Sequence, residues 1–105
     1  MASSIDEKKR FRQIGHLLNP IVLLGNQGLT EAVLAEIDRA LEDHELIKVR
    51  IGGEDREARR EAIEIMTSTT KSQAVQIVGK IVLLYRAAKK PNPKLSNILR
   101  ANASN

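Results

Sequence analysis

A four-residue loop, Gly25-Asn26-Gln27-Gly28, is the segment whose residue types and spacing are best suited to hold a ligand. It separates a short apolar run from a segment with helical spacing, so it leads into a helix N-terminus. Glycine permits positive φ and lets a ligand approach the backbone closely, and free N–H groups at a helix N-terminus attract anions. The loop therefore predicts a phosphate contact. The alternative is a strand-to-helix turn that needs glycine only for its geometry.

Catalytic chemistry has little support in the sequence. The chain contains no cysteine, and its two histidines are His16 and His44. No nucleophile stands with a matched base and an orienting group. The glycine loop also lacks the third glycine of a dinucleotide fingerprint and the Lys-Ser or Lys-Thr pair of a P-loop. We therefore predict a protein without enzymatic activity, without a metal site and without a cofactor.

Basic residues gather at both ends of the chain. The net charge is +4, with +2 over residues 1–12, +6 over residues 80–105 and an acidic middle. A basic surface attracts polyanions, either nucleic acid or an anionic membrane, and a solubilising tail is the alternative interpretation. The cations that we predict to face a polyanion are Lys8, Lys9 and Arg12 near the N-terminus, with Lys48, Arg50, Lys80 and Arg86 as secondary candidates.

Aromatic residues are scarce, which limits how a nucleic acid would be recognised. The chain has only Phe11 and Tyr85, and Phe11 lies on an apolar helical stripe that predicts a place in the core. Modules that read single-stranded bases on a sheet stack them on exposed aromatic rings. If nucleic acid is the partner, contacts with the sugar–phosphate backbone and with overall shape should therefore dominate.

Helical and strand periodicities alternate along the chain. Helices are predicted over residues 6–18 and 30–43, and over a third segment capped by Asp55 whose apolar stripe is Ala58, Ala62, Ile65, Met66 and Thr69. The charged residues of this third helix look like an ordinary solvated surface. Strands are predicted over residues 21–24, buried on both faces, and over residues 46–51, with alternating faces. Two more, residues 74–78 and 81–86, are joined by Gly79-Lys80 in a type II′ turn.

The order of elements, α-β-α-β-α-β-β, predicts a two-layer α/β fold with a four-stranded mixed sheet. At 105 residues we expect one domain, over residues 1–90, and a flexible tail over residues 91–105. No apolar run approaches the about 20 residues of a membrane span, and the N-terminus lacks the apolar stretch of a signal peptide. The absence of cysteine fits a reducing compartment. We expect a cytoplasmic protein, and separately we expect it to be a monomer.

Three separated segments together resemble one known family. They are residues 18–30, Leu-Asn-Pro-Ile-Val-Leu-Leu-Gly-Asn-Gln-Gly-Leu-Thr; residues 41–51, with the core Glu-Leu-Ile-Lys-Val; and residues 75–86, Val-Gln-Ile-Val-Gly-Lys-Ile-Val-Leu-Leu-Tyr-Arg. In this order they resemble the YhbY family, the bacterial single-domain form of the CRM (chloroplast RNA splicing and ribosome maturation) domain. The resemblance runs from about residue 8 to residue 87.

The resemblance implies a compact α/β fold similar to the C-terminal domain of translation initiation factor three, with helices packed on a four-stranded mixed sheet. It implies RNA binding, with Gly25, Asn26, Gln27 and Gly28 as the family's loop beside a basic first helix. It also implies association with ribosomal RNA in precursors of the large ribosomal subunit, in ribosome assembly. The alternatives are a general RNA chaperone or splicing-type cofactor, and a protein-binding adaptor that docks on a ribosomal protein.

Overall fold

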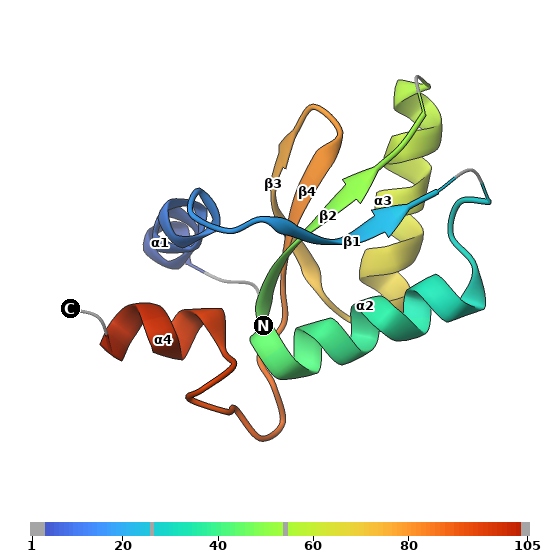
Figure 1. Ribbon diagram of the computed structural model, residues 1–105. Helices are drawn as coiled ribbons and strands as arrows, with labels where there is room; N and C mark the ends of the chain where they lie inside the picture. The colour runs from blue at the N-terminus through green and yellow to red at the C-terminus, as the bar shows by residue number, and fades with distance from the viewer. Residues whose placement is uncertain (1–3, 26, 54, 104–105) are drawn as a thin grey trace.

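Helices and strands alternate along the chain, and the strands meet in one central sheet (Figure 1). The computed structural model describes residues 4–25, 27–53 and 55–103. The elements in chain order are α1 (Ile5–Gly15), β1 (Pro20–Leu24), α2 (Glu31–His44), β2 (Leu46–Ile51), α3 (Arg56–Thr70), β3 (Gln73–Val78), β4 (Ile81–Tyr85) and α4 (Asn97–Ala103). All the predicted elements are present in the predicted order, and α4 is an addition.

The four strands form one mixed sheet in the order β1-β2-β4-β3. β1 pairs with β2 in parallel, with α2 as the crossover connection. β4 pairs antiparallel with both β2 and β3. Gly79, the first residue of the β3–β4 turn, has φ +57°, as the predicted type II′ turn requires. The mixed sheet with its final hairpin is therefore confirmed.

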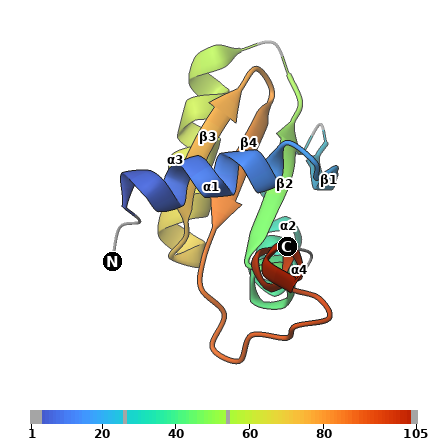
Figure 2. The same cartoon turned by 90° about the vertical axis from the view of Figure 1, so that its left-hand side faces the viewer.

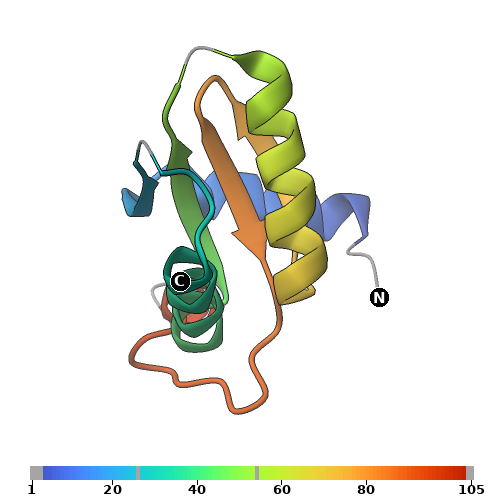
Figure 3. The ribbon, with the colours of Figure 1, turned by 90° about the vertical axis from the view of Figure 1, so that its right-hand side faces the viewer.

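Helices cover both faces of the sheet, so the prediction of two layers is corrected to three. Figure 2 shows α1 crossing one face, with α4 on the same side. Figure 3 shows α3 on the opposite face. The middle strands carry apolar residues on both faces: Leu46 and Leu83 pack toward α1, whereas Ile47 and Leu84 pack toward α2 and α3. A sheet whose central strands are buried on both faces needs a helical layer on each side.

The larger core lies between the sheet and the pair α2 and α3. Its buried side chains come from alternate strand positions and from the apolar stripes of both helices: Val22, Leu24, Ile37, Leu41, Ile47, Val49, Ile51, Ile63, Met66, Val82 and Leu84. Both helices begin at a predicted N-cap. The side chains of Thr30 and Asp55 accept hydrogen bonds from backbone N–H groups of the first turn. Each cap fixes where its helix leaves the preceding loop.

The smaller core holds α1 against the other face. Phe11 is buried, as predicted, and stacks on Tyr85 with the ring centroids 4.4 Å apart. Gly15 sets how closely α1 approaches the sheet, because a Cβ there would lie 2.7 Å from a terminal carbon of Leu83. Burial raises the pKa of the Tyr85 hydroxyl, with smaller contributions from nearby carboxylates, so this hydroxyl remains protonated.

The prediction that β1 is buried on both faces is wrong. β1 is an edge strand in which Val22 and Leu24 are buried. Ile21 and Leu23, on the other face, are 48% and 64% exposed. An unbroken apolar run is typical of a strand covered on both sides, but it carries no information about whether a helix reaches the strand.

Two helices differ in detail from their predicted patterns. α1 ends at Gly15, and Leu17 in the turn that follows is almost fully exposed. On α3 the buried residues include Ile63 and Thr70, whereas the predicted stripe residues Ile65 and Thr69 are exposed. The buried stripe of α3 is therefore rotated relative to the predicted one. The rotation arises because α3 packs on the sheet and on α2 at once, and the periodicity of the sequence does not show this packing.

The C-terminal segment differs from the flexible tail predicted over residues 91–105. Residues 86–96, which we call the strap, run past the C-terminal end of α2, and α4 then packs against α1 and β2 (Figure 1). Ser96 is fully buried, and its hydroxyl donates to Glu45 over 2.6 Å. The Asn97 amide donates to the carbonyl of Leu46 over 2.7 Å. Residues 104 and 105 lie outside the described residues.

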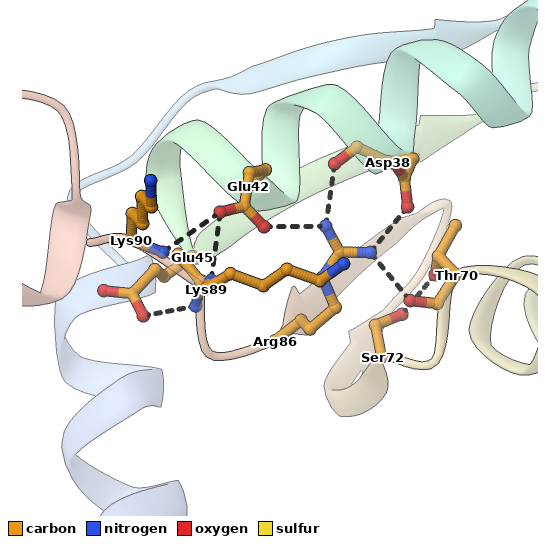
Figure 4. A network of polar contacts seen from close by, with 9 residues as sticks. Asp38, Glu42, Glu45, Thr70, Ser72, Arg86, Lys89 and Lys90 are labelled. Atoms are coloured by element: carbon orange, nitrogen blue, oxygen red, sulfur yellow. Dashed lines mark hydrogen bonds and ion pairs between the residues drawn. The ribbon is translucent and has the colours of Figure 1, made fainter. Parts of the chain in front are cut away.

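Acidic side chains of the α2 C-terminal end hold the strap in place (Figure 4). Glu45 is buried at a positive φ of 63°, and its second carboxylate oxygen accepts from the Ala88 N–H over 2.8 Å. Glu42 accepts from the N–H of Lys89 over 3.0 Å. Arg86 donates to Asp38 over 2.6 Å. The strap is therefore fixed by contacts between residues more than forty positions apart in sequence.

Candidate nucleic-acid interface

Turn glycines gather at one end of the sheet, which we call the glycine end (residues 25–28, 52–53 and 79–80). The parallel strands β1 and β2 finish there, since Leu24 pairs with Ile51. The β3–β4 turn lies at the same end because Arg50, near the end of β2, pairs with Ile81 at the start of β4. Turns that contain glycine thus concentrate where three strands end.

A groove of about 300 Å³ separates the predicted loop from the turn after β2. Gly25 and Gly28 form one side, Gly52 and Gly53 form the other, and Arg59 reaches in from α3. A Cβ at Gly25 or Gly28 would have no described neighbour within 4 Å, so the loop backbone is open to a ligand. Gln27 is exposed, whereas Asn26 lies outside the described residues.

The cations of α1 line a second, shallow groove. Lys9, Arg12 and His16 lie along it, facing Gln76 of β3. Lys8, the third cation predicted for this helix, is half-buried and is not part of the lining. Lys8 is adjacent to Lys9 in sequence and so points to a different side of the helix from Lys9, although it lies one turn before Arg12.

One row of side chains across the sheet is left uncovered between α1 and the glycine end. The pairing register aligns Leu23, Arg50, Ile81 and Val78, one residue from each strand. Leu23 and Val78 are more than 60% exposed, and Arg50 is exposed as well. α1 covers Leu83, two positions further along β4, so this open row lies about 7 Å from the covered one.

Three of the predicted cations therefore lie on one surface, the α1 side of the sheet, and the glycine loop begins two residues after Leu23, at the edge of that surface. We call it the cationic face: Lys9 and Arg12 of α1, Arg50 in the open row, and the loop at residues 25–28. The row that separates the cations of α1 from the loop is aliphatic apart from Arg50.

The remaining predicted cations take other positions. The Lys48 ammonium donates to the carbonyl of Leu18 over 3.1 Å and so ties β2 to the α1–β1 connection. Arg86 is held by Asp38 and by the Thr70 carbonyl near the strap, away from the glycine end. Lys80 lies at the glycine end but lines a pocket on the α3 side of the sheet. Lys48 and Arg86 thus have structural contacts in place of an open surface.

α3 contributes a basic group where the mixed charges predicted an ordinary solvated surface. Its arginines recur at i, i+3 and i+4 and so share one side of the helix, whereas its glutamates recur at i, i+4 and i+7 on another. The arginines are Arg56, Arg59 and Arg60, and the glutamates are Glu57, Glu61 and Glu64. The two spacings were available in the sequence, and a helical projection of this segment would have separated the charges.

The side chains gathered on these surfaces are mainly hydrogen-bond donors to anions. Within residues 4–25, 27–53 and 55–103, no three potential metal-ligating side chains of the His, Cys, Asp or Glu type lie together. In the same part of the chain, no helix is both long and apolar enough to cross a membrane. Guanidinium and ammonium donors instead dominate the cationic face, and both attract anionic oxygens.

A small mixed sheet flanked by helices, with cations and open glycine turns at one end, defines a polyanion-binding module. The chain belongs to the CRS1 / YhbY (CRM) domain family, whose model matches residues 4–86. The match confirms the resemblance seen in the three sequence segments. α4 and nearly all of the strap lie beyond the matched residues.

Proteins of similar sequence and fold agree with this assignment. The Probable RNA-binding protein PA4753 of Pseudomonas aeruginosa is 47% identical over 100 residues, which cover 95% of this chain and 96% of that protein. An RNA-binding protein of Haemophilus influenzae is 45% identical over 92 residues, 88% of this chain and 93% of that one. The solution structure of the hypothetical protein SAV1595 from Staphylococcus aureus matches with a TM-score of 0.74 and 29% identity, over 90% of this chain and 98% of that one.

Proposed function

We propose that this protein binds RNA through the cationic face. The observation that carries the proposal is that Lys9, Arg12 and Arg50 lie on one side of the sheet, whose open row ends next to the glycine loop. The names of the Pseudomonas aeruginosa and Haemophilus influenzae relatives, both RNA-binding proteins, support the same partner. The proposed role is non-enzymatic, because the face offers donors for anions and no catalytic constellation.

The proposed mechanism follows from the donors available. The cations of α1 and Arg50 neutralise successive phosphates, and the backbone at Gly25 and Gly28 approaches a further phosphate closely. The aliphatic side chains of the open row contact sugars. Phe11 is buried, so base stacking on that ring has no part in the mechanism. Recognition then rests on the backbone and shape of the RNA more than on its sequence.

The finer proposal concerns which RNA is bound. We infer that the partner is ribosomal RNA in precursors of the large ribosomal subunit, and that the protein acts in the cytoplasm as a monomer during ribosome assembly. Membership of the CRM family supports this inference. A binding mode that reads shape and backbone also suits a structured RNA better than an unstructured message.

Salt dependence tests the electrostatic mechanism. If about four to six phosphates are neutralised, the logarithm of the binding constant should fall against the logarithm of the salt concentration with a slope of about −3 to −5. Fluorescence anisotropy of a labelled RNA, titrated with the purified protein at several salt concentrations, measures this slope. A slope near zero would contradict the mechanism.

The exposed aliphatic row supports a second candidate, a protein-binding adaptor. Leu23 and Val78 form part of an apolar surface that continues to Ile21, and exposed apolar patches often mark protein contacts. Arg50 stands in the middle of this patch and disfavours a wholly apolar partner. The salt titration uses only purified protein and RNA, so a steep slope favours RNA over the adaptor.

A further inference from the structure

We propose that the pocket between α3 and the β3–β4 turn binds one nucleotide of the RNA, with its base on an apolar floor and its phosphate among arginines. The pocket lies on the α3 side of the sheet, opposite α1. The inference rests on the proposed function and extends the RNA contact around the glycine end to a second face. It would make the bound strand bend over the end of the sheet.

The floor of the pocket is aliphatic. Ile51 of β2 and Ile63 of α3 are buried beneath it, and Ile77 of β3 lines it while remaining 57% exposed. Ile77 faces α3 because it pairs with Val82, which is buried in the core on that side. The volume is about 360 Å³, within the range of pockets that hold small organic ligands. An exposed isoleucine at its mouth leaves apolar surface for a ligand to cover.

The rim of the pocket is cationic. Arg56, Arg59 and Arg60 line it, with Lys80 of the β3–β4 turn on the other side. Arg59 donates to the carbonyl of Gly53 over 3.0 Å, which orients its guanidinium and leaves further N–H donors. Arg56 and Arg60 make no hydrogen bond or ion pair with another described residue. Guanidinium groups bind phosphate in two-point geometry, so three of them suit a phosphate group.

The acidic residues of α3 do not neutralise this rim. Glu57, Glu61 and Glu64 are absent from the pocket lining and lie on another side of the helix. The Asp55 carboxylate precedes the arginines, and it caps α3 by accepting from the Glu57 N–H over 2.9 Å. Three guanidinium groups are thus held together on one side of a helix, and an anion between them would relieve their mutual repulsion.

Two features favour a nucleotide over a bare phosphate or an acidic peptide. An inorganic phosphate makes no apolar contact with the aliphatic floor, whereas the apolar faces of a nucleobase can cover this floor. The pocket is also continuous with the proposed RNA path. Arg59 and Ile51 line both this pocket and the groove beside Gly25 and Gly28. A phosphate at the glycine loop would therefore be followed by a nucleotide in the pocket.

The isoleucines of the floor provide the experiment. The intact protein, with isotope-labelled isoleucine methyl groups, is titrated with adenosine monophosphate, and separately with ribose 5-phosphate and with a glutamate-rich peptide. We expect the mononucleotide to shift the methyl signals of Ile77 and Ile63 through the ring current of the base, with saturation, while Ile21 on the other face stays unchanged. Ribose 5-phosphate should bind on the order of tenfold more weakly, because it leaves the floor uncovered.

A pair of charge variants on α3 completes the test. Arg56→Glu with Arg60→Glu should weaken mononucleotide binding at least on the order of tenfold. The matched variant Glu57→Gln with Glu61→Gln, on the other side of the same helix, should retain or strengthen it. No shift of Ile77 or Ile63, equal affinity for ribose 5-phosphate, or tighter binding of the acidic peptide would each overturn the proposal. If labelled RNA still binds with a steep salt dependence in such a case, the nucleotide pocket fails and the proposed function stands.

Discussion

Replacing Glu45 with alanine is expected to lower the free energy of unfolding by about 3 kcal/mol. The carboxylate accepts from the buried Ser96 hydroxyl over 2.6 Å and from the Ala88 N–H over 2.8 Å. Alanine leaves both donors without an acceptor, and each such loss costs about 1–3 kcal/mol. Thermal unfolding followed by circular dichroism should show a melting temperature about 10 °C lower or more, and the amide protons of α4 should lose protection from hydrogen exchange.

Two further variants separate this role of Glu45 from a general effect of charge. Glu45→Gln preserves the shape of the side chain, and its amide can accept the Ala88 N–H and donate to Ser96, so we expect less than half of the loss. Asp43→Ala removes an acid from the same end of α2, and Asp43 makes no hydrogen bond with another described residue, so the stability should change by about 0.5 kcal/mol or less. A Glu45→Ala protein as stable as the wild type would show that the strap is not anchored there.

The second large effect is expected for RNA binding. Arg12→Glu combined with Arg50→Glu places two carboxylates on the cationic face, one in the groove of α1 and one in the open row. Repulsion from neighbouring phosphates should raise the dissociation constant for RNA on the order of tenfold or more at low salt. Neither side chain is buried or engaged in a hydrogen bond with a described residue, so the melting temperature should change little. Anisotropy titration of a labelled RNA measures the change.

The matched control lies on the strap. Lys89→Glu with Lys90→Glu makes the same change of charge on exposed residues at the opposite end of β2, next to Glu42. Only long-range attraction is lost there, and salt screens it within about 10 Å. Arg59 and Arg60 of α3 do not serve as this control, because Arg59 lines the groove beside the glycine loop. Equal losses in the two double variants would contradict a specific cationic face.

Local signals in the sequence predicted most of the fold. The N-caps Thr30 and Asp55, the alternation over β2 and the turn at Gly79 each act within a few residues, and each is confirmed. The features that were missed depend on which element covers which. The burial of β1 on one face only, and the third layer made by α1 and α4, are decided by packing between distant segments.

The docking of the C-terminal segment shows why such features escape prediction. Glu45 and Ser96 are 51 residues apart, and neither has a sequence context that marks a buried pair. Glu45 even adopts a positive φ that favours glycine, which no local preference predicts. Arg86 resembles any other basic residue in the sequence, and only the fold brings it against Asp38.

The candidate site was predicted only in part, because its loop has a local signal in the sequence whereas its other residues are brought together by the fold. The loop at residues 25–28 could be recognised because glycine spacing before a helix has a local physical meaning. Which cations lie near the loop depends on the pairing register of the strands. Arg50 belongs to the cationic face because it pairs with Leu23 of the parallel strand β1. Lys48, two positions earlier, instead donates to the Leu18 carbonyl in the α1–β1 connection. The arginines of α3 were visible in their spacing, but their pocket needs Ile77 from a distant strand.

The most direct test of the central claim is a map of where RNA contacts the protein. Isotope-labelled protein titrated with a short RNA stem-loop, and followed by amide NMR spectroscopy, reports on each backbone position. We predict that the largest shifts occur at Gly25, Gly28 and Arg50 and along the groove of α1, with the strap and α4 unchanged. Shifts centred on the strap and the C-terminal end of α2, with the glycine end unmoved, would contradict the account.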